Sequence, residues 1–290
     1  MDFYLGTHIP SWLWSGVAPV PLFVSRNTLC RYKTLQPSKV PWALDSGGFT
    51  HIQKHGTWTL SPKDYIKEVC RYKEEIGQMQ WAAPQDWMCE PIQLKRTGKT
   101  VKQHQTLTID NFISLREIDP SLPIIPVLQG WEAKDYLSHR EEYERRGILL
   151  EKEATVGLGS VCRRQATQEC AQIVRSLQPL KLHGFGFKIQ GLRNIAHLLK
   201  SADSLAWSMG ARKLPLLLDA CVGSHKNCAN CPKYALIWRQ QVLNAIETNK
   251  EEIGQMQWAA PQNWIQRLNR EGKMMRMGNL LGGEKKNPLP

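Results

Sequence analysis

Four polar side chains stand at or beside the ends of short apolar segments of this sequence. Asp45 closes the segment WALD, Asp86 follows AAPQ, and Gln129 closes PVLQ. A fourth, Asp203, opens the segment DSLAWS. If the segments are parallel strands, their carboxyl ends meet at one edge of the sheet, so we expect these side chains to lie near one another.

Three carboxyl groups and one carboxamide suit the exchange of a base on a sugar. A carboxylate can attack the sugar C1′ through an oxocarbenium-like transition state and hold the sugar covalently. A second carboxyl group can protonate the leaving base and deprotonate the incoming one. A further Asp and a Gln can bind the amide edge of a purine. The alternative for each Asp is an ordinary turn or helix-capping role.

A second group of residues has the spacing of a metal site. Cys221, His225, Cys228 and Cys231 form the pattern C-x3-H-x2-C-x2-C. A structural zinc ion takes four nitrogen or sulfur ligands in a tetrahedron, so the pattern predicts Zn²⁺. Cys221 is the least secure of the four, and a redox-active Cys pair is the alternative.

Short apolar segments recur along the chain at intervals that leave room for a helix between them. We expect strands at residues 2–7, 21–25, 42–46, 79–85, 124–129, 155–160, 182–187 and 204–208. A helix should begin at Pro62, because Ser61 is a suitable N-cap and apolar residues follow at helical spacing. Eight strand–helix units predict an α/β fold, a (β/α)8 TIM-like barrel. An open doubly wound sheet is the alternative, although its Gly-rich fingerprint is missing after the first strand.

One segment of the chain occurs twice. Residues 73–85 (KEEIGQMQWAAPQ) recur without change as residues 250–262, after which Asp86 is replaced by Asn263. A barrel has one position for that strand, so the second copy must lie elsewhere. We therefore predict a barrel domain over residues 1–245, which includes the metal-binding segment 221–231. Residues 249–290 should form a partly disordered appendage that arose by segmental duplication.

The composition favours a partner that carries negative charge. The 290 residues include 38 Lys and Arg against 26 Asp and Glu, a net charge of +12. Nucleic acid is the commonest partner of such a chain, although a basic enzyme without one is the alternative. The sequence has neither a long apolar stretch nor a signal-like N-terminus, which predicts a cytoplasmic protein without a membrane segment.

Five motifs in order resemble those of the tRNA-guanine transglycosylases. They are the segments 45–49 (DSGGF), 127–130 (VLQG), 156–159 (VGLG), 183–186 (HGFG) and 203–204 (DS). Residues 1 to about 245 look closer still to the shorter DNA-guanine transglycosylases, which insert 7-cyano-7-deazaguanine into DNA. The metal segment departs from the tRNA enzymes, which use three Cys and a distant downstream His, since no His follows Cys231.

The resemblance implies a role for each residue that matches a motif. Asp203 would be the nucleophile and Asp45 the general acid and base. Asp86 and Gln129 would bind the guanine edge. The remaining base-binding positions would be Ser46, Gly47, Gly130, Gly157, Leu158 and Gly184, with Gly157 and Leu158 contributing backbone groups. We expect His183 to be a packed, hydrogen-bonded histidine.

The resemblance also implies the partners. They would be DNA and a 7-deazaguanine base, and the need to extrude a base from duplex DNA suggests a strand-opening ATPase as well. The alternatives are the same exchange on tRNA, a non-catalytic nucleic-acid-binding subunit, and an unrelated barrel glycosidase.

Overall fold

The computed structural model describes the backbone of residues 1–258 and the side chains of residues 1–248. The chain divides into two compact units, Met1–Ile246 and Glu247–Pro290. The candidate site and the metal segment both belong to the first unit, which is described below.

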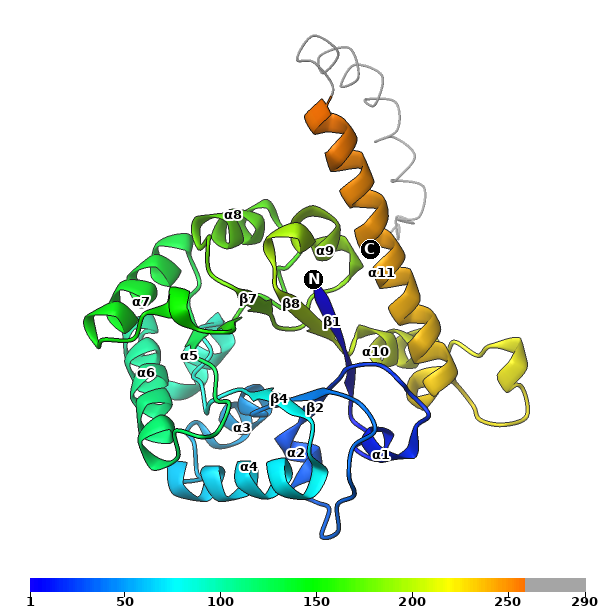
Figure 1. Cartoon of the computed structure of the whole chain (residues 1–290), viewed down its shortest axis with the longest axis horizontal. Helices are drawn as coiled ribbons and strands as arrows, with labels where there is room; N and C mark the ends of the chain where they lie inside the picture. The colour runs from blue at the N-terminus through cyan, green and yellow to red at the C-terminus, as the bar shows by residue number, and fades with distance from the viewer. Residues whose placement is uncertain (259–290) are drawn as a thin grey trace, which may run out of the picture. The chain divides into compact units, whose positions relative to one another are not determined.

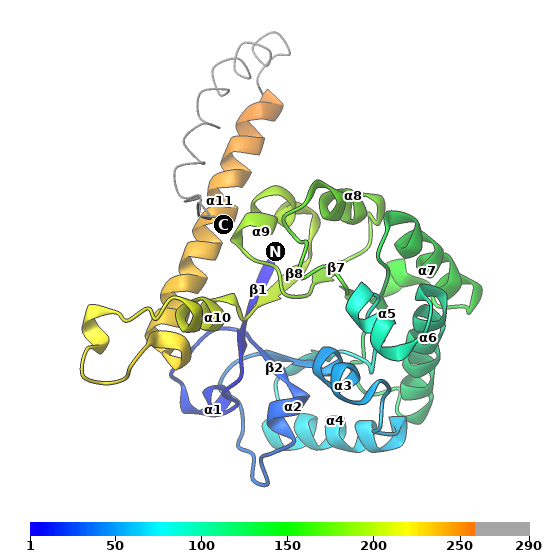
Figure 2. The ribbon, with the colours of Figure 1, turned by 180° about the vertical axis from the view of Figure 1, so that it is seen from behind.

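Eight parallel strands form one sheet that curls into a barrel (Figures 1 and 2). Their order is β4-β3-β2-β1-β8-β7-β6-β5, so each strand pairs with its neighbour in sequence and β1 pairs with β8. The remaining gap between β4 and β5 is bridged at Ala82 and Ile124. There the Ala82 amide donates to the Pro123 carbonyl at 3.0 Å, and the Ile125 amide donates to the Ala82 carbonyl at 3.1 Å. The predicted TIM-like barrel is confirmed.

The strands are short and end where the candidate site begins. Their bounds are β1 (Asp2–Thr7), β2 (Leu22–Ser25), β3 (Trp42–Asp45), β4 (Met79–Ala82), β5 (Val127–Leu128), β6 (Val156–Leu158), β7 (Leu182–Gly184) and β8 (Ser201–Ser204).

The first ten helices of the chain surround this barrel on the outside, and the eleventh continues from the first unit into the second (Figure 1). They are α1 (Trp12–Ser15), α2 (Arg26–Leu29), α3 (Gly48–His55), α4 (Pro62–Ile76), α5 (Pro91–Thr97), α6 (Val101–Ile118), α7 (Ala133–Arg145), α8 (Gln168–Ser176), α9 (Ile189–Ile195), α10 (Ala206–Lys213) and α11 (Pro232–Trp258). Short 3-10 helices follow at η1 (Leu150–Lys152), η2 (Ala196–Leu198), η3 (Asp219–Cys221) and η4 (Cys228–Asn230). As predicted, α4 begins at Pro62, and the Ser61 hydroxyl caps it by accepting a bond from the Asp64 amide at 3.1 Å.

The alternation of side chains along each strand decides which residues can reach the site. Successive residues of a strand point to opposite faces, so every second one points into the barrel. The inner residues form a small aromatic core in which Phe23 of β2 contacts Trp81 of β4 and His183 of β7 across the barrel. The other face of the strands packs against the helices, as Trp42 and Leu44 do in the large core. Ala43 of β3 and Ser201 of β8 point into the barrel. Asp45 and Asp203 lie two residues further along these strands and therefore point inward as well.

The eighth strand is not where the sequence predicts it. Residues 204–208 were expected to form it, but β8 is Ser201–Ser204 and the following residues begin α10. The residues of β8 are small and polar (SADS), so a search for apolar segments passes over them. Trp207, which suggested a strand, instead lies on α10 and stacks on Trp12 with ring centroids 5.5 Å apart. Asp203 is therefore the penultimate residue of the strand rather than the residue before it.

The duplicated segment has two different structures. In the first copy, residues 73–76 end α4 and residues 79–82 form β4. In the second copy, the matching residues 250–258 all continue helix α11. The rest of the predicted appendage, residues 259–290, lies outside the described residues, so its predicted disorder stays a prediction. Within the described part of the chain, no helix has the length and apolar character needed to cross a membrane.

Candidate active site

The carboxyl ends of the strands bring the predicted polar side chains together. Asp45 is the last residue of β3, and Gln129 directly follows β5. Asp86 lies four residues beyond the end of β4, and Asp203 lies near the end of β8. Gln129, Asp86 and Asp203 are buried, whereas Asp45 keeps part of its surface exposed. They therefore sit where TIM-barrel enzymes carry their reactive groups.

Asp86 and Gln129 are joined by a direct hydrogen bond. The Gln129 amide Nε2 donates to Asp86 Oδ2 at 2.6 Å, and the Ser46 hydroxyl donates to Asp86 Oδ1 at 3.2 Å. The Trp58 indole donates to the backbone carbonyl of Asp86 at 3.0 Å, which fixes the loop after β4. The carboxylate and the amide thus present acceptor and donor atoms side by side.

Burial perturbs two of the carboxyl groups. It raises the pKa of Asp86 to about 7, with a further rise from the negative charge of Asp45, while bonds from Gln129 and Ser46 oppose the change. Burial also raises the pKa of Asp45. The Ser25 hydroxyl and the Gly47 amide oppose that rise, whereas the charge of Asp203 adds to it. A carboxyl group that retains its proton more readily than usual is suited to act as a general acid.

Asp203 is held by groups from the neighbouring strand β7 and the loop after it. The Gly186 amide donates to Asp203 Oδ1 at 2.9 Å, and Nε2 of His183 lies 3.3 Å from the same oxygen. Nδ1 of His183 lies 2.8 Å from the Ser201 hydroxyl. The hydrogen bonds described for this carboxylate all engage Oδ1, and Oδ2 takes part in none of them.

His183 was expected to be packed and hydrogen-bonded, and the structure confirms this. Its ring is fully buried in the aromatic core, 4.5 Å from the centroid of Trp81 and 6.0 Å from that of Tyr4. The sequence offered no sign that its partner would be Asp203. That contact depends on the register in which His183 of β7 lies opposite Ser201 of β8.

Two of the predicted glycines allow close approach beside the site. Gly47 has φ +76°, and its carbonyl accepts a bond from the side-chain amide Nδ2 of Asn27 at 3.0 Å. Gly130 packs against Asp135 and Tyr136, where a Cβ would come within 2.9 Å of both side chains. Both follow polar residues of the site, Ser46 and Gln129.

The other predicted backbone positions are partly used by the sheet itself. The Gly157 amide donates to the Pro126 carbonyl at 2.8 Å, and the Leu158 carbonyl accepts from the Phe185 amide at 3.4 Å. Gly184 lies on the outer side of β7, where a Cβ would meet Phe187. The structure thus places Gly184 away from the buried carboxylates. The Leu158 carbonyl has a second lone pair that could accept another hydrogen bond.

Two further buried polar residues join the site without having been predicted. Ser160 has φ +57° and its hydroxyl lies 2.7 Å from Gln129 Oε1. The same hydroxyl lies 3.0 Å from Oε2 of Glu90, a carboxyl group that is 4% exposed. A buried Glu beside a motif is a weak signal in a sequence, because its burial is decided by the packing of distant segments.

The four predicted metal ligands converge. One ligand atom from each of Cys221, His225, Cys228 and Cys231 lies within 4.8 Å of the others. Cys221 Sγ is 3.7 Å from Cys231 Sγ, which matches the edge of about 3.8 Å expected of a tetrahedron with Zn–S bonds of about 2.3 Å. His225 Nε2 is 3.3 Å from Cys228 Sγ, and the Leu218 amide donates to that sulfur at 3.4 Å. This Cys₃His cluster could bind a metal ion, and its donor set is consistent with zinc.

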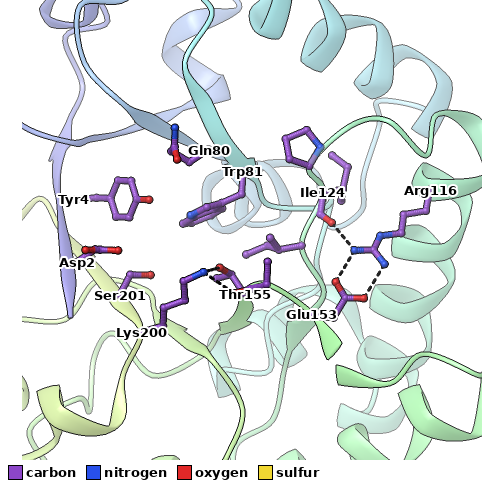
Figure 3. Close-up of a pocket in the computed structure, with 13 residues that line it drawn as sticks. Asp2, Tyr4, Gln80, Trp81, Arg116, Ile124, Glu153, Thr155, Lys200 and Ser201 are labelled. Carbon is purple, nitrogen blue, oxygen red and sulfur yellow. Dashed lines mark hydrogen bonds and ion pairs between the residues drawn. The ribbon is translucent and has the colours of Figure 1, made fainter. Parts of the chain in front are cut away.

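A separate cavity of about 360 Å³ opens at the other end of the barrel, where the strands begin (Figure 3). Tyr4 and Trp81 form its inner wall and the Lys200 amine crosses its floor to Thr155. The Arg116–Glu153 ion pair closes one side at 2.7 Å. Two pairs of its polar side chains, Lys200 with Thr155 and Arg116 with Glu153, are bonded to each other, and none of the predicted site residues lines it.

Comparison with known proteins identifies the family. No match is found among curated proteins. A family model described as DpdA, DeoxyPurine in DNA protein A, matches residues 1–250, which include the whole barrel and the metal segment. The match covers most of the chain and all of the candidate site, and the chain therefore belongs to the DpdA family.

Proposed function

We propose that this protein replaces guanine in DNA with 7-cyano-7-deazaguanine through a covalent intermediate between Asp203 and the deoxyribose. Membership of the DpdA family implies a DNA-modifying enzyme of the guanine transglycosylase type, which exchanges guanine for a deazapurine. The observation that carries the finer proposal is the convergence of Asp45, Asp86, Gln129 and Asp203 at the carboxyl ends of the strands.

The first half of the reaction removes guanine. Asp203 Oδ2 attacks C1′ as the bond from C1′ to the base breaks, and the bonding electrons leave with the base. Asp45 supplies the proton that the departing guanine takes up, a role favoured by its raised pKa. The Gly186 amide and His183 hold the other carboxylate oxygen, so the nucleophile keeps its orientation.

The second half inserts the new base. The ionised Asp45 removes a proton from the incoming 7-deazaguanine, whose nitrogen then attacks C1′ and displaces the Asp203 carboxylate. The two halves are symmetrical, so the enzyme ends in its starting protonation state. No water is consumed, which requires that the base pocket be refilled before water reaches the ester.

Asp86 and Gln129 would select guanine and its deaza analogue. The Asp86 carboxylate can accept from the N1–H and the 2-amino group, while the second hydrogen of Gln129 Nε2 can donate to O6. The 2.6 Å bond between the two side chains keeps the Gln129 donor next to the Asp86 acceptor, which is the arrangement that these two contacts need. Ser46 would act by orienting Asp86.

Several features suit a DNA substrate. The net charge of +12 provides affinity for phosphate without sequence preference. Arg163 lies in the loop after β6, exposed, with its guanidinium 5.0 Å from the ring centroid of Phe49. A base in a duplex must be extruded before its C1′ can reach Asp203, so a strand-opening ATPase would be a suitable partner.

Zinc would have a structural role in this scheme. Cys221, His225, Cys228 and Cys231 would hold it in the segment between α10 and α11. These residues lie in and around the two 3-10 helices η3 and η4, so a metal bound by them would link these helices and stabilise this segment.

The deciding experiment is nucleoside mass spectrometry of DNA and of tRNA from cells that express this protein with a supply of 7-cyano-7-deazaguanine. We expect the deazaguanine in DNA. Its appearance in tRNA and never in DNA, even with candidate strand-opening partners present, would establish the tRNA alternative instead.

The covalent step has its own test. Incubation with a guanine-containing DNA strand should give an adduct that survives denaturing electrophoresis, and Asp203→Asn should abolish it. Asp110→Asn is the matched control, since Asp110 is exposed on α6 and paired with Arg146. An adduct that still forms in a folded Asp203→Asn variant would remove Asp203 from the nucleophile role.

A further inference from the structure

Ser160 occupies an unusual position for a residue with a side chain. It is buried, follows Gly159 at the end of β6, and has a left-handed backbone with φ +57°. A residue other than Gly rarely adopts this conformation unless its surroundings require it, and such residues cluster at functional sites. The strained backbone places the Ser160 hydroxyl between two chain segments that carry site residues.

Three groups contact the Ser160 hydroxyl. The Cys89 amide donates to it at 2.7 Å, Gln129 Oε1 lies at 2.7 Å, and Glu90 Oε2 lies at 3.0 Å. A hydroxyl has one hydrogen and two lone pairs, so it cannot donate to Gln129 and Glu90 at once. Because the contact with Gln129 Oε1 is the shorter of the two, we take the hydroxyl to donate its hydrogen to that oxygen. Oε2 of Glu90 then faces the oxygen of that hydroxyl, and it can pair with it only if the Glu90 carboxyl group is protonated and donates to Ser160.

The surroundings of Glu90 agree with this assignment. Its carboxyl group is 4% exposed, and burial raises its pKa, although its own backbone amide, the bond to Ser160 and the charges of Arg163 and Arg164 oppose the rise. With Cys89 and Glu90 both donating, the two lone pairs of Ser160 are occupied. Ser160 can then act toward Gln129 as a donor and not as an acceptor.

This arrangement fixes which way the Gln129 amide faces. If the amide turned over, Nε2 would meet a hydroxyl that has no lone pair left, and Oε1 would face Asp86 Oδ2. The Nε2 hydrogen would then lack an acceptor, and the two oxygens would repel each other. A buried donor without a partner costs free energy, so the turned-over amide is disfavoured. Gln129 Nε2 therefore stays on the side of Asp86, where its second hydrogen can reach the base.

We propose that Ser160, supported by Glu90, makes the base pocket select an oxygen rather than an amino group at position 6 of the purine. This inference rests on the proposed function, since it takes Gln129 to face that position. Ser160 acts through Gln129 and is a positioning residue. Without its hydroxyl, the amide could turn over when Asp86 is protonated and would then present a carbonyl oxygen to the base.

The test measures the binding of free bases to the full chain and needs no turnover. Guanine carries an oxygen at position 6, and 2,6-diaminopurine carries an amino group there. Dissociation constants for both are measured by calorimetry on the wild type and on Ser160→Ala, Ser160→Gly and Glu90→Gln. Ser160→Gly removes the hydroxyl and also relieves the left-handed backbone, so it keeps the test possible if the Ala variant folds poorly.

We expect the preference of the wild type for guanine to fall about tenfold in both Ser160 variants, the effect of losing one buried hydrogen bond. Glu90→Gln keeps an N–H donor toward Ser160 and should retain the preference within about twofold. Ser38→Ala is the matched control. The Ser38 hydroxyl is also buried and donates to the Val40 carbonyl at 2.7 Å, but it is not part of the candidate site. A merely structural role would weaken both bases equally and leave their ratio unchanged.

The outcomes separate this inference from the proposed function. An unchanged ratio in both folded Ser160 variants would overturn the inference and leave base exchange untouched. A wild type that binds guanine selectively through Ser160 but never exchanges it into nucleic acid would overturn the proposed reaction alone. A wild type with no preference for guanine would contradict both.

Discussion

Replacing Asp86 by Asn should make the protein more stable while removing its base recognition. Burial raises the pKa of Asp86 from its usual 3.8 to about 7. A rise of about three pH units corresponds to about 4 kcal/mol, at about 1.4 kcal/mol per unit. The folded state holds this proton more tightly than the unfolded chain. The resulting stability is therefore complete below about pH 4 and is lost as the pH rises through 7.

Asp86→Asn has no charge to bury, so its advantage over the wild type should grow with pH. From the two pKa values we expect the difference in unfolding free energy to increase by roughly 2 to 3 kcal/mol between pH 5 and pH 8. Urea denaturation followed by circular dichroism at several pH values measures it. All other titrating groups are shared by the two proteins, and Asp110→Asn controls for the loss of an exposed carboxylate.

Guanine binding provides the second half of this prediction. An ionised Asp86 accepts from the base, so the affinity of the wild type should rise with pH and level off above about 7. At pH 6 the dissociation constant should be about ten times its value on the plateau. Asp86→Asn should bind guanine weakly with no such dependence. A stability difference that stays constant from pH 5 to pH 8, or a variant that binds guanine as tightly as the wild type, would refute the reasoning.

Three further predictions follow from the site and its surroundings. His183→Phe keeps the aromatic packing but removes the contact to Asp203 Oδ1. The kcat for base exchange should therefore fall roughly 10- to 100-fold with little change in KM. A kcat equal to that of the wild type would show that Gly186 alone orients the nucleophile. Purified protein should contain about one zinc per chain by elemental analysis, and chelation should lower its thermal stability; protein that is fully stable and free of zinc would contradict this. A chain that ends at Thr248 should retain base exchange, because the candidate site lies within Met1–Ile246, and a folded but inactive truncation would reveal a function for the later residues.

Local patterns in the sequence were enough to predict the barrel and the main polar side chains of its site. Parallel strands alternate with helices, so the end of each apolar segment marks one rim of the barrel. Asp45, Gln129 and Asp86 follow from that rule alone. The Cys₃His spacing likewise predicted ligands that the structure brings within 4.8 Å.

Partners across the barrel could be seen only in the tertiary structure. The contact of His183 with Asp203 depends on the register of β7 against β8, and that of Ser160 with Glu90 joins residues 70 positions apart. Neither contact leaves a periodic signal in the sequence. The strand that carries Asp203 was itself misplaced, because its small residues are defined by their neighbours β1 and β7 rather than by their own hydrophobicity.

The duplicated segment shows how far identical residues can diverge. Residues 79–82 form strand β4 because Trp42 and Ala43 of β3 supply partners for their backbone groups. The same amino acids at 256–258 continue helix α11, whose hydrogen bonds connect residues four positions apart. The sequence by itself determined only that the second copy needs a place outside the barrel, and it left strand and helix both open. Tertiary structure decided between them, because a strand needs a neighbouring strand and a helix does not.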